Sequence, residues 1–293
     1  MNEIELSAGT IRYRDTGEGP PIVFVHGLLV DGTLWRKVVP SLEGRYRCIV
    51  PDWPLGSHTV PMKPSADLSP PGIAGLFAEF LEAMDLRDVT LVANDTGGAL
   101  TQILMASGQT DRIGRVVLTP CDSFENFLPP MFRPLQWLAR VPGAVYPVVQ
   151  QLRVPALRRL PLAFGWLTKR RVPNDVTAAW LRPAQTDKGV RRDIARLLRG
   201  IDSRYTLEAA EKLGGFDRPV LIAWAPEDRF FPLEHARRLA ELLPNARVEE
   251  VPDSYTFVSE DQPELVARLV GEFAGAAPRG AAGRKSGDRS AAG

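Results

Sequence analysis

The stretch TLVANDTGGALTQ, residues 90–102, places an aspartate at a sharp turn between a predicted strand and a predicted helix. A β-branched run precedes Asp95, and a helix-compatible run, Ala99 to Ala106, follows it. Small residues stand two positions before and after the aspartate, at Ala93 and Gly97. This spacing is typical of a nucleophile elbow, in which a strained turn brings the start of a helix close against a strand. An aspartate that simply caps a helix is the alternative interpretation.

An acid at this turn has a definite chemistry. An oxygen nucleophile there lies at the positive end of a helix dipole, and the amide of Thr96 is free to stabilise negative charge. A carboxyl group with a reference pKa of about 3.9 is ionised at neutral pH, so Asp95 can attack a carbon atom without a base. It cannot unaided activate the water that would cleave the resulting ester. A complete hydrolytic reaction therefore requires a base elsewhere in the chain.

Short apolar runs rich in β-branched residues alternate with stretches of helical spacing over most of the chain. The predicted strands are residues 9–17, 22–25, 48–50, 89–92, 116–118, 220–223 and 248–251, and helical stretches include residues 70–86 and 232–243. Buried strands that alternate with helices predict the α/β class, with a mostly parallel sheet and helices on both faces.

The alternation breaks between Cys121 and Leu213, where helix-like pieces are punctuated by prolines. We interpret residues 121–213 as a helical lid inserted into a core domain formed by residues 1–120 and 214–273. The tail, residues 274–293, is small, polar and charged, and is expected to be disordered.

Composition narrows the function class. The chain has 293 residues, 44% of them hydrophobic, and a net charge of +1, which favours neither a nucleic-acid binder nor an acidic tail. The chain has only two cysteines, Cys48 and Cys121, and we expect neither a disulfide framework nor a metal cluster. Without a signal peptide pattern or an apolar run of about 20 residues, we expect a cytoplasmic protein with a small-molecule substrate and no cofactor.

The predicted lid is strongly basic. Residues 133–204 contain 15 Lys and Arg, 4 Asp and no Glu, a net charge of +11, so the rest of the chain carries −10. Arginine side chains on solvated faces account for such a charge most simply. The alternative is a lid that attracts an anionic ligand, a membrane surface or an acidic partner.

Three further motifs follow the order of a known superfamily. They are FVHGLLVDGTLW (24–35), VLIAWAPEDRFFP (220–232) and VPDSYTFVSEDQPELVARL (251–269). With the elbow, they resemble the α/β-hydrolase fold superfamily along about residues 10–273. The resemblance implies that the amides of Leu28 and Thr96 form an oxyanion hole and that Asp228 is the catalytic acid. Asp95 in place of serine resembles the haloalkane dehalogenase and epoxide hydrolase branch.

The chain departs from that branch in its last loop. The position seven residues before Pro263, where the family usually has histidine, is Thr256, and Tyr255 replaces the usual glycine. A threonine hydroxyl can position water or bind a substrate oxygen, but it does not titrate near neutral pH. Haloalkane dehalogenases also have Asn and Trp where this chain has Leu28 and Thr96, so halide chemistry is poorly supported.

Other residues can supply what the last loop lacks. Among the three histidines, His58 follows a strand on the expected catalytic side and is the candidate substitute base, although a hydrogen-bonded turn residue is the alternative. His26 is expected to support the oxyanion loop beside the substrate, and His235 to be exposed on an outward-facing helix. Asp122 is a second candidate acid. Tyr146 and Tyr205 of the lid can polarise an epoxide oxygen or simply pack.

The leading hypothesis is hydrolysis of a small or medium apolar substrate, of the epoxide, ester or halide type, through an ester of Asp95. One alternative is a lyase, isomerase or cyclase in which Asp95 is a general base. Another is a catalytically silent binding protein that retains the fold and its pocket.

Overall fold

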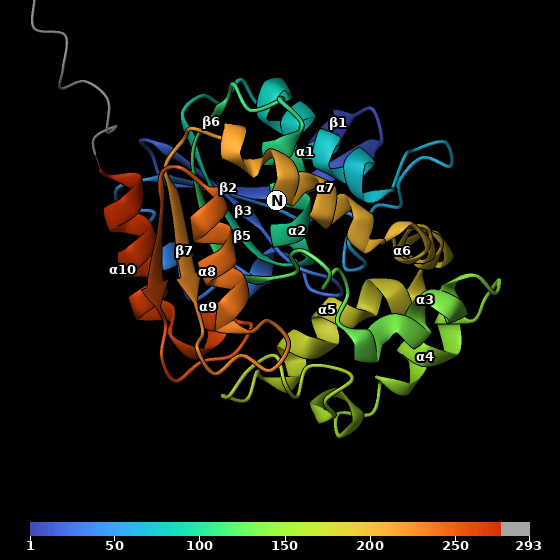
Figure 1. The fold of residues 1–293 in the computed structure, drawn as a ribbon. Coiled ribbons are helices and arrows are strands. Elements are labelled where there is room, and N and C mark those ends of the chain that lie inside the picture. Colours follow the sequence, from blue (N-terminus) through green and yellow to red (C-terminus); the bar gives the residue numbers. More distant parts are fainter. Residues whose placement is uncertain (277–293) are drawn as a thin grey trace, which may run out of the picture.

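The computed structural model describes residues 1–276, so the expected disorder of the tail falls, from residue 277 onward, outside the described residues. Its centre is an eight-stranded sheet in the order β1-β2-β4-β3-β5-β6-β7-β8 (Figure 1). The strands are β1 (Asn2–Leu6), β2 (Gly9–Thr16), β3 (Pro21–Val25), β4 (Arg47–Pro51), β5 (Val89–Asp95), β6 (Ile113–Cys121), β7 (Val220–Trp224) and β8 (Ala246–Glu250). Strands β1, β2 and β4 pair antiparallel, and the pairs from β4 to β8 are parallel.

The sheet confirms the predicted α/β class, and its strands are buried as their apolar runs indicated. All nine residues of β6 and all five of β7 are buried. Strand β1 was not predicted, because most of it is exposed and its apolar alternation is short. It pairs with β2 as a hairpin at the edge of the sheet.

Helices flank the sheet and pack on one another. Helices α1 (Pro70–Ala83), α2 (Thr96–Ala106) and α7 (Ser203–Lys212) pack in sequence against one another. Helix α10 (Pro263–Ala274) packs against β7 and the short turn η2 (Val39–Ser41), and α9 (Val258–Asp261) packs against η1 (Gly32–Trp35). Helix α8 (Leu233–Leu242) contacts β7 and β8.

The segment between β6 and β7, residues 122–219, is mainly helical. It contains α3 (Arg133–Ala139), α4 (Val145–Gln151), α5 (Asn174–Thr186), α6 (Lys188–Gly200) and α7. Helices α3 to α6 contact one another and gather to one side of the sheet, whereas α7 packs on α2 (Figure 1). Among residues 1–276, no helix has the length and hydrophobicity that a membrane span requires.

Candidate active site

Asp95 lies at the junction of β5 and α2 in a strained backbone conformation. Its φ is 54° and its ψ −134°, a region that non-glycine residues rarely adopt. The glycines after it are required by close packing. A Cβ atom at Gly97 would lie 2.4 Å from the carbonyl oxygen of His26, and one at Gly98 would lie 2.3 Å from the Cβ of Cys121. The small residues of the motif therefore let α2 begin directly against the neighbouring strands.

The carboxyl group of Asp95 is partly buried and faces two backbone amides. The N–H groups of Leu28 and Thr96 favour its charged form by hydrogen bonding and so lower its pKa. The loop after β3 approaches so closely that a Cβ atom at Gly27 would lie 2.1 Å from Asp95 Oδ2. Burial raises the pKa of Asp95 to about 7, and the charge of Asp228 adds to this rise, while the two amides oppose it. The structure thus brings together the amide pair and the carboxylate that the sequence pattern singled out.

Asp228 and Thr256 lie together in the loops after β7 and β8. Asp228 Oδ1 accepts hydrogen bonds from the amides of Phe230 (2.7 Å) and Phe231 (2.8 Å). Burial raises the pKa of Asp228 to about 6, and the nearby Thr256 hydroxyl is among the groups that oppose this rise. Asp228 Oδ2 and Thr256 Oγ1 nevertheless have no hydrogen bond of normal geometry to a described residue. Two buried polar atoms are therefore left to bind something else.

Asn94 connects this pair to the elbow. Its side-chain amide donates to the carbonyl oxygen of Thr256 (2.7 Å) and to Thr119 Oγ1 (2.9 Å). The residue before Asp95 thus positions the loop in which the family usually has histidine. Sequence reasoning missed Asn94, because nothing in the spacing of the elbow requires a polar residue there.

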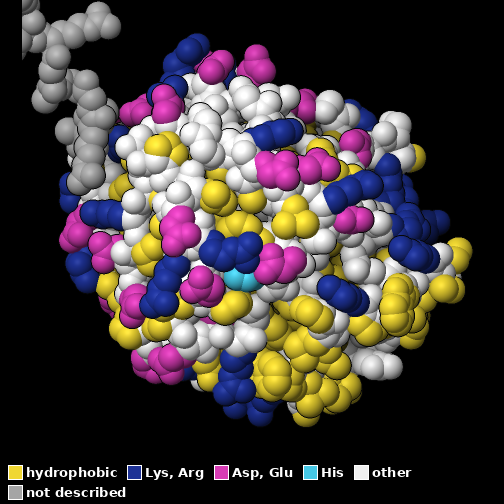
Figure 2. All heavy atoms as spheres, viewed as in Figure 1, with side chains coloured by type: hydrophobic (Ala, Val, Ile, Leu, Met, Phe, Trp, Pro, Cys, Tyr) yellow, Lys and Arg dark blue, Asp and Glu magenta, His cyan; other side chains and the backbone are white. Residues whose placement is uncertain are grey.

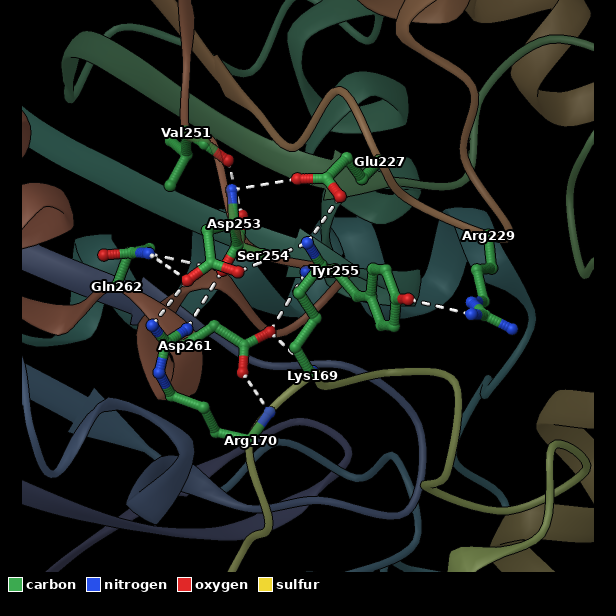
Figure 3. A network of polar contacts seen from close by, with 10 residues as sticks. All are labelled: Lys169, Arg170, Glu227, Arg229, Val251, Asp253, Ser254, Tyr255, Asp261 and Gln262. Atoms are coloured by element: carbon green, nitrogen blue, oxygen red, sulfur yellow. Dashed lines mark hydrogen bonds and ion pairs between the residues drawn. The ribbon is translucent and has the colours of Figure 1, made fainter.

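A network of ion pairs fixes the same loop from the other side (Figure 3). Asp261 accepts hydrogen bonds from the backbone amides of Lys169 (2.9 Å), Arg170 (2.8 Å) and Tyr255 (3.0 Å). The side chain of Arg170 also forms an ion pair with Asp253 (2.7 Å). The helical segment and the Thr256 loop are consequently held together. The Tyr255 side chain points toward Arg229, which donates a hydrogen bond to its hydroxyl (Figure 3).

Asp122, the second candidate acid, also lies beside the elbow. It is buried, accepts a hydrogen bond from the amide of Leu128 (2.9 Å) and lies 3.4 Å from the hydroxyl of Thr96. Burial and the charge of Asp95 together raise its pKa well above the usual range. Asp95, Asp122 and Asp228 therefore form a group of carboxyls whose pKa values all lie above the ordinary value of an aspartate.

The two predicted site histidines, His26 and His58, both form hydrogen bonds with other residues of the protein. His26 Nε2 accepts from the amide of Trp53 (2.8 Å), so Nδ1 donates to the carbonyl of Gly27 (2.9 Å). Burial lowers the pKa of His26 to about 4, and the side chain supports the oxyanion loop without lining the cavity. His58 Nδ1 accepts from the amide of Gly56 (3.3 Å), and Nε2 lies 3.3 Å from Asp193 of α6.

These contacts place His58 in a buried pair that joins the loop after β4 to α6. No contact between described residues links it to Asp95, and it does not line the cavity described below.

The expectation that His235 is exposed was wrong. The side chain is buried, its ring packs edge-on against Phe124, and Nδ1 lies 3.2 Å from Ser123 Oγ. Leu239, four residues later, is also buried, so His235 lies on the inner face of α8.

An apolar cavity lies above Asp95. A space of about 70 Å³ over the carboxyl continues into one of about 330 Å³, and the two share seven lining residues. The shared residues are Leu28, Leu29, Phe132, Leu135, Leu152, Leu162 and Ala163. Among the described residues, polar side chains enter these spaces only at Asp95, Thr96 and Gln151, and no lysine or arginine lines either one. Tyr146 and Tyr205 do not line them and instead contact Arg191 and Arg204.

Comparison with known proteins agrees with this architecture. A family model described as the alpha/beta hydrolase fold matches residues 20–263. Haloalkane dehalogenase 2 of Mycobacterium tuberculosis is 27% identical over 276 residues, which cover 91% of this chain and 92% of the relative. A cis-3-alkyl-4-alkyloxetan-2-one decarboxylase of Xanthomonas campestris is 27% identical over 279 residues, with coverage of 89% and 91%.

Two further comparisons extend the picture. The non-heme chloroperoxidase CPO-A1 of Kitasatospora aureofaciens is 28% identical over 250 residues, with coverage of 82% and 86%. The crystal structure of a putative ancestral haloalkane dehalogenase superposes with a TM-score of 0.75 at 21% identity, covering 94% of this chain and 98% of the other. The names of these relatives describe different reactions, so the similarity establishes the fold and leaves the reaction to the site.

Proposed function

The chain belongs to the alpha/beta hydrolase fold family, and on that basis we propose that Asp95 is its reactive carboxylate, which attacks a carbon atom of an apolar electrophile. The observation that carries the proposal is the position of Asp95 at the floor of an apolar cavity, on a strained turn and bound by two amides. The helical segment that lines the cavity acts as its lid.

The proposed reaction has two steps. Ionised Asp95 attacks carbon, the bond from that carbon to the leaving oxygen or halogen breaks, and an ester of Asp95 forms. Water then attacks the carbonyl carbon of this ester, and the amides of Leu28 and Thr96 stabilise the negative charge on its oxygen. Collapse regenerates the carboxylate and releases an alcohol that carries an oxygen atom from Asp95.

The second step depends on a base that is weaker than histidine. We assign the roles of the usual acid and histidine to the unpaired oxygen of Asp228 and the hydroxyl of Thr256, which have no hydrogen bond of normal geometry to a described residue. With a pKa of about 6, Asp228 is ionised at neutral pH and can accept a proton from water that Thr256 positions. We therefore expect ester hydrolysis to limit turnover.

The cavity favours an apolar epoxide over an alkyl halide. Among the described residues that line the 70 Å³ space over Asp95, none has a side-chain N–H group that could hold a departing halide ion. An opened epoxide needs a proton for its alkoxide, and the Thr96 hydroxyl lines the cavity and is hydrogen-bonded to Asp122. Burial and the charge of Asp95 raise the pKa of Asp122 well above its usual range, and we assign the supply of that proton to the Asp122–Thr96 pair.

A second candidate function uses the same carboxyl as a general base in a lyase, isomerase or cyclase reaction. The pKa of Asp95, about 7, favours it, since a proton-transfer group works best when its pKa is near the operating pH. Such a reaction forms no covalent adduct and incorporates no oxygen from water.

Intact-protein mass spectrometry after exposure to styrene oxide and to a long-chain terminal epoxide tests the proposal. We expect wild type to gain the mass of one epoxide on the tryptic peptide 88–112, which contains Asp95. Asp95→Asn should gain nothing, and Asp228→Asn should retain the adduct for longer because release is impaired. Asp88→Asn, an exposed change in the same peptide, is the matched control and should behave like wild type. An adduct that persists in Asp95→Asn would refute the proposal.

A further inference from the structure

The region from residue 126 to residue 174 combines basic and apolar side chains and contains no Asp or Glu. Its eight cationic residues are Arg133, Arg140, Arg153, Arg158, Arg159, Lys169, Arg170 and Arg171. Arg158 is buried against backbone carbonyls, and Lys169 and Arg170 are paired with acids of the core. The remaining five are all exposed and form no ion pair with any described residue, and four of them, Arg133, Arg140, Arg153 and Arg159, lie within residues 133–162.

Large apolar side chains are exposed in the same region. Trp137 is 66% exposed and Leu162 61%, and Leu138, Val141 and Leu160 are exposed as well. Figure 2 shows hydrophobic side chains gathered over the part of the surface where Figure 1 places α3, α4 and the loops beside them. Monomeric soluble proteins rarely display such a continuous apolar surface unless it contacts a partner or a membrane. We call this surface the lid face, formed by the five apolar residues and the four unpaired arginines.

The lid face is also the entrance to the cavity. Leu138, Leu160 and Leu162 are exposed to solvent and at the same time line the 330 Å³ space that leads to Asp95. A ligand that reaches Asp95 by this route passes from an apolar surface into an apolar cavity, without crossing a charged rim.

We propose that the lid face docks on an anionic lipid bilayer, from which an apolar substrate enters the cavity. Interfacial segments combine an exposed tryptophan and leucines, which insert among acyl chains, with arginines that contact anionic headgroups. The lid face has both features and lacks the acidic residues that an anionic surface would repel. Substrate entry rests on the proposed function, whereas docking does not depend on the chemistry of Asp95.

Vesicle binding tests the docking. Wild type is mixed with vesicles of phosphatidylcholine alone, or of phosphatidylcholine and phosphatidylglycerol in equal amounts, and the bound fraction is measured by sedimentation. We expect binding to the anionic vesicles that weakens with added salt, and little binding to phosphatidylcholine alone. Neutralising arginines, as in Arg140→Gln with Arg153→Gln, should weaken binding by about fivefold for each arginine. Trp137→Glu with Leu162→Glu should abolish it.

Matched controls distinguish docking through the lid face from non-specific adsorption to vesicles. Leu242 on α8 is 39% exposed, as Leu138 is, but it lies far from the lid in sequence. The variant Leu242→Glu should therefore bind the vesicles like wild type. Asp95→Asn should also bind like wild type, which distinguishes failure of docking from failure of the proposed chemistry. Absence of binding to anionic vesicles would overturn the proposal. So would a dimer in solution that Trp137→Glu with Leu162→Glu dissociates, because the lid face would then be an interface between two copies.

Discussion

Replacing Asp95 by asparagine should stabilise the protein, and more so at high pH. The folded-state pKa of Asp95, about 7, lies above its ordinary value of 3.8, so the folded chain binds a proton that the unfolded chain has lost. Wild-type stability contributed by this group is therefore fully present below about pH 4, falls as the pH rises, and stops falling above about pH 7. Asparagine has no charge to bury and still offers an oxygen to the amides of Leu28 and Thr96.

The size of the effect follows from the same two pKa values. The interval from 3.8 to about 7 corresponds to roughly 4 kcal/mol at high pH. At about pH 5 only roughly 2 kcal/mol of this penalty has developed, so the advantage of the variant should widen by roughly 2–3 kcal/mol between about pH 5 and about pH 8. Against a typical total stability of about 5–15 kcal/mol, this change is large.

Urea unfolding followed by tryptophan fluorescence at the two pH values measures this widening. Asp253→Asn is the contrasting control, because Arg170 and Lys169 hold the pKa of that exposed carboxyl below its usual range. Its replacement should give no stabilisation that grows with pH. An Asp95→Asn advantage that stays constant between the two pH values would refute the account, since Asp95 would then be ionised normally in the folded protein.

Three other substitutions examine the site. Gly27→Ala places a Cβ atom 2.1 Å from Asp95 Oδ2, and we expect adduct formation with an epoxide to slow by about a hundredfold or more; a wild-type rate would contradict the close approach. Thr256→His should place an imidazole beside the unpaired oxygen of Asp228 and speed release of the covalent ester by about 10²–10⁴-fold; unchanged release would argue against Asp228 as the acid of this site. His58→Gln should lower the melting temperature by breaking the pair with Asp193 while leaving ester release unchanged; accumulation of the ester in this variant alone would show that His58 is the base.

Local patterns in the sequence were sufficient to predict the elbow and every strand of the sheet except β1. The β-branched runs predicted the parallel strands, because buried strands need continuous apolar sequence. The positions of Ala93 and Gly97 indicated the tight turn around Asp95. The structure explains the glycines of this turn, because neighbouring atoms leave no room for a Cβ atom at Gly97 or Gly98. The elbow pattern indicated the amide of Thr96, whereas that of Leu28 was implied by the resemblance to the α/β-hydrolase fold superfamily.

Long-range partners could not be predicted in the same way. The sequence gives no sign that His58 meets Asp193, 135 residues later, or that Asn94 binds the backbone of Thr256, 162 residues later. The burial of His235 was predictable in principle, because Leu239 is four residues further along the same face of α8. The end of the lid could not be predicted for the same reason. Helix α7 packs on α2, and the sequence of α7 does not show that it packs there.

The oxygen atom that enters the first molecule of product tests the central claim most directly. Wild type, in excess over an apolar epoxide, is allowed a single turnover in water labelled with the heavy isotope of oxygen, and both product and peptide 88–112 are analysed by mass spectrometry. If the reaction proceeds through an ester of Asp95, water attacks the carbonyl carbon of that ester. The heavy oxygen then appears in Asp95, and the first product carries unlabelled oxygen from the enzyme. A first product that carries the heavy oxygen, with peptide 88–112 unlabelled, would contradict the account, because water would then have attacked the substrate directly.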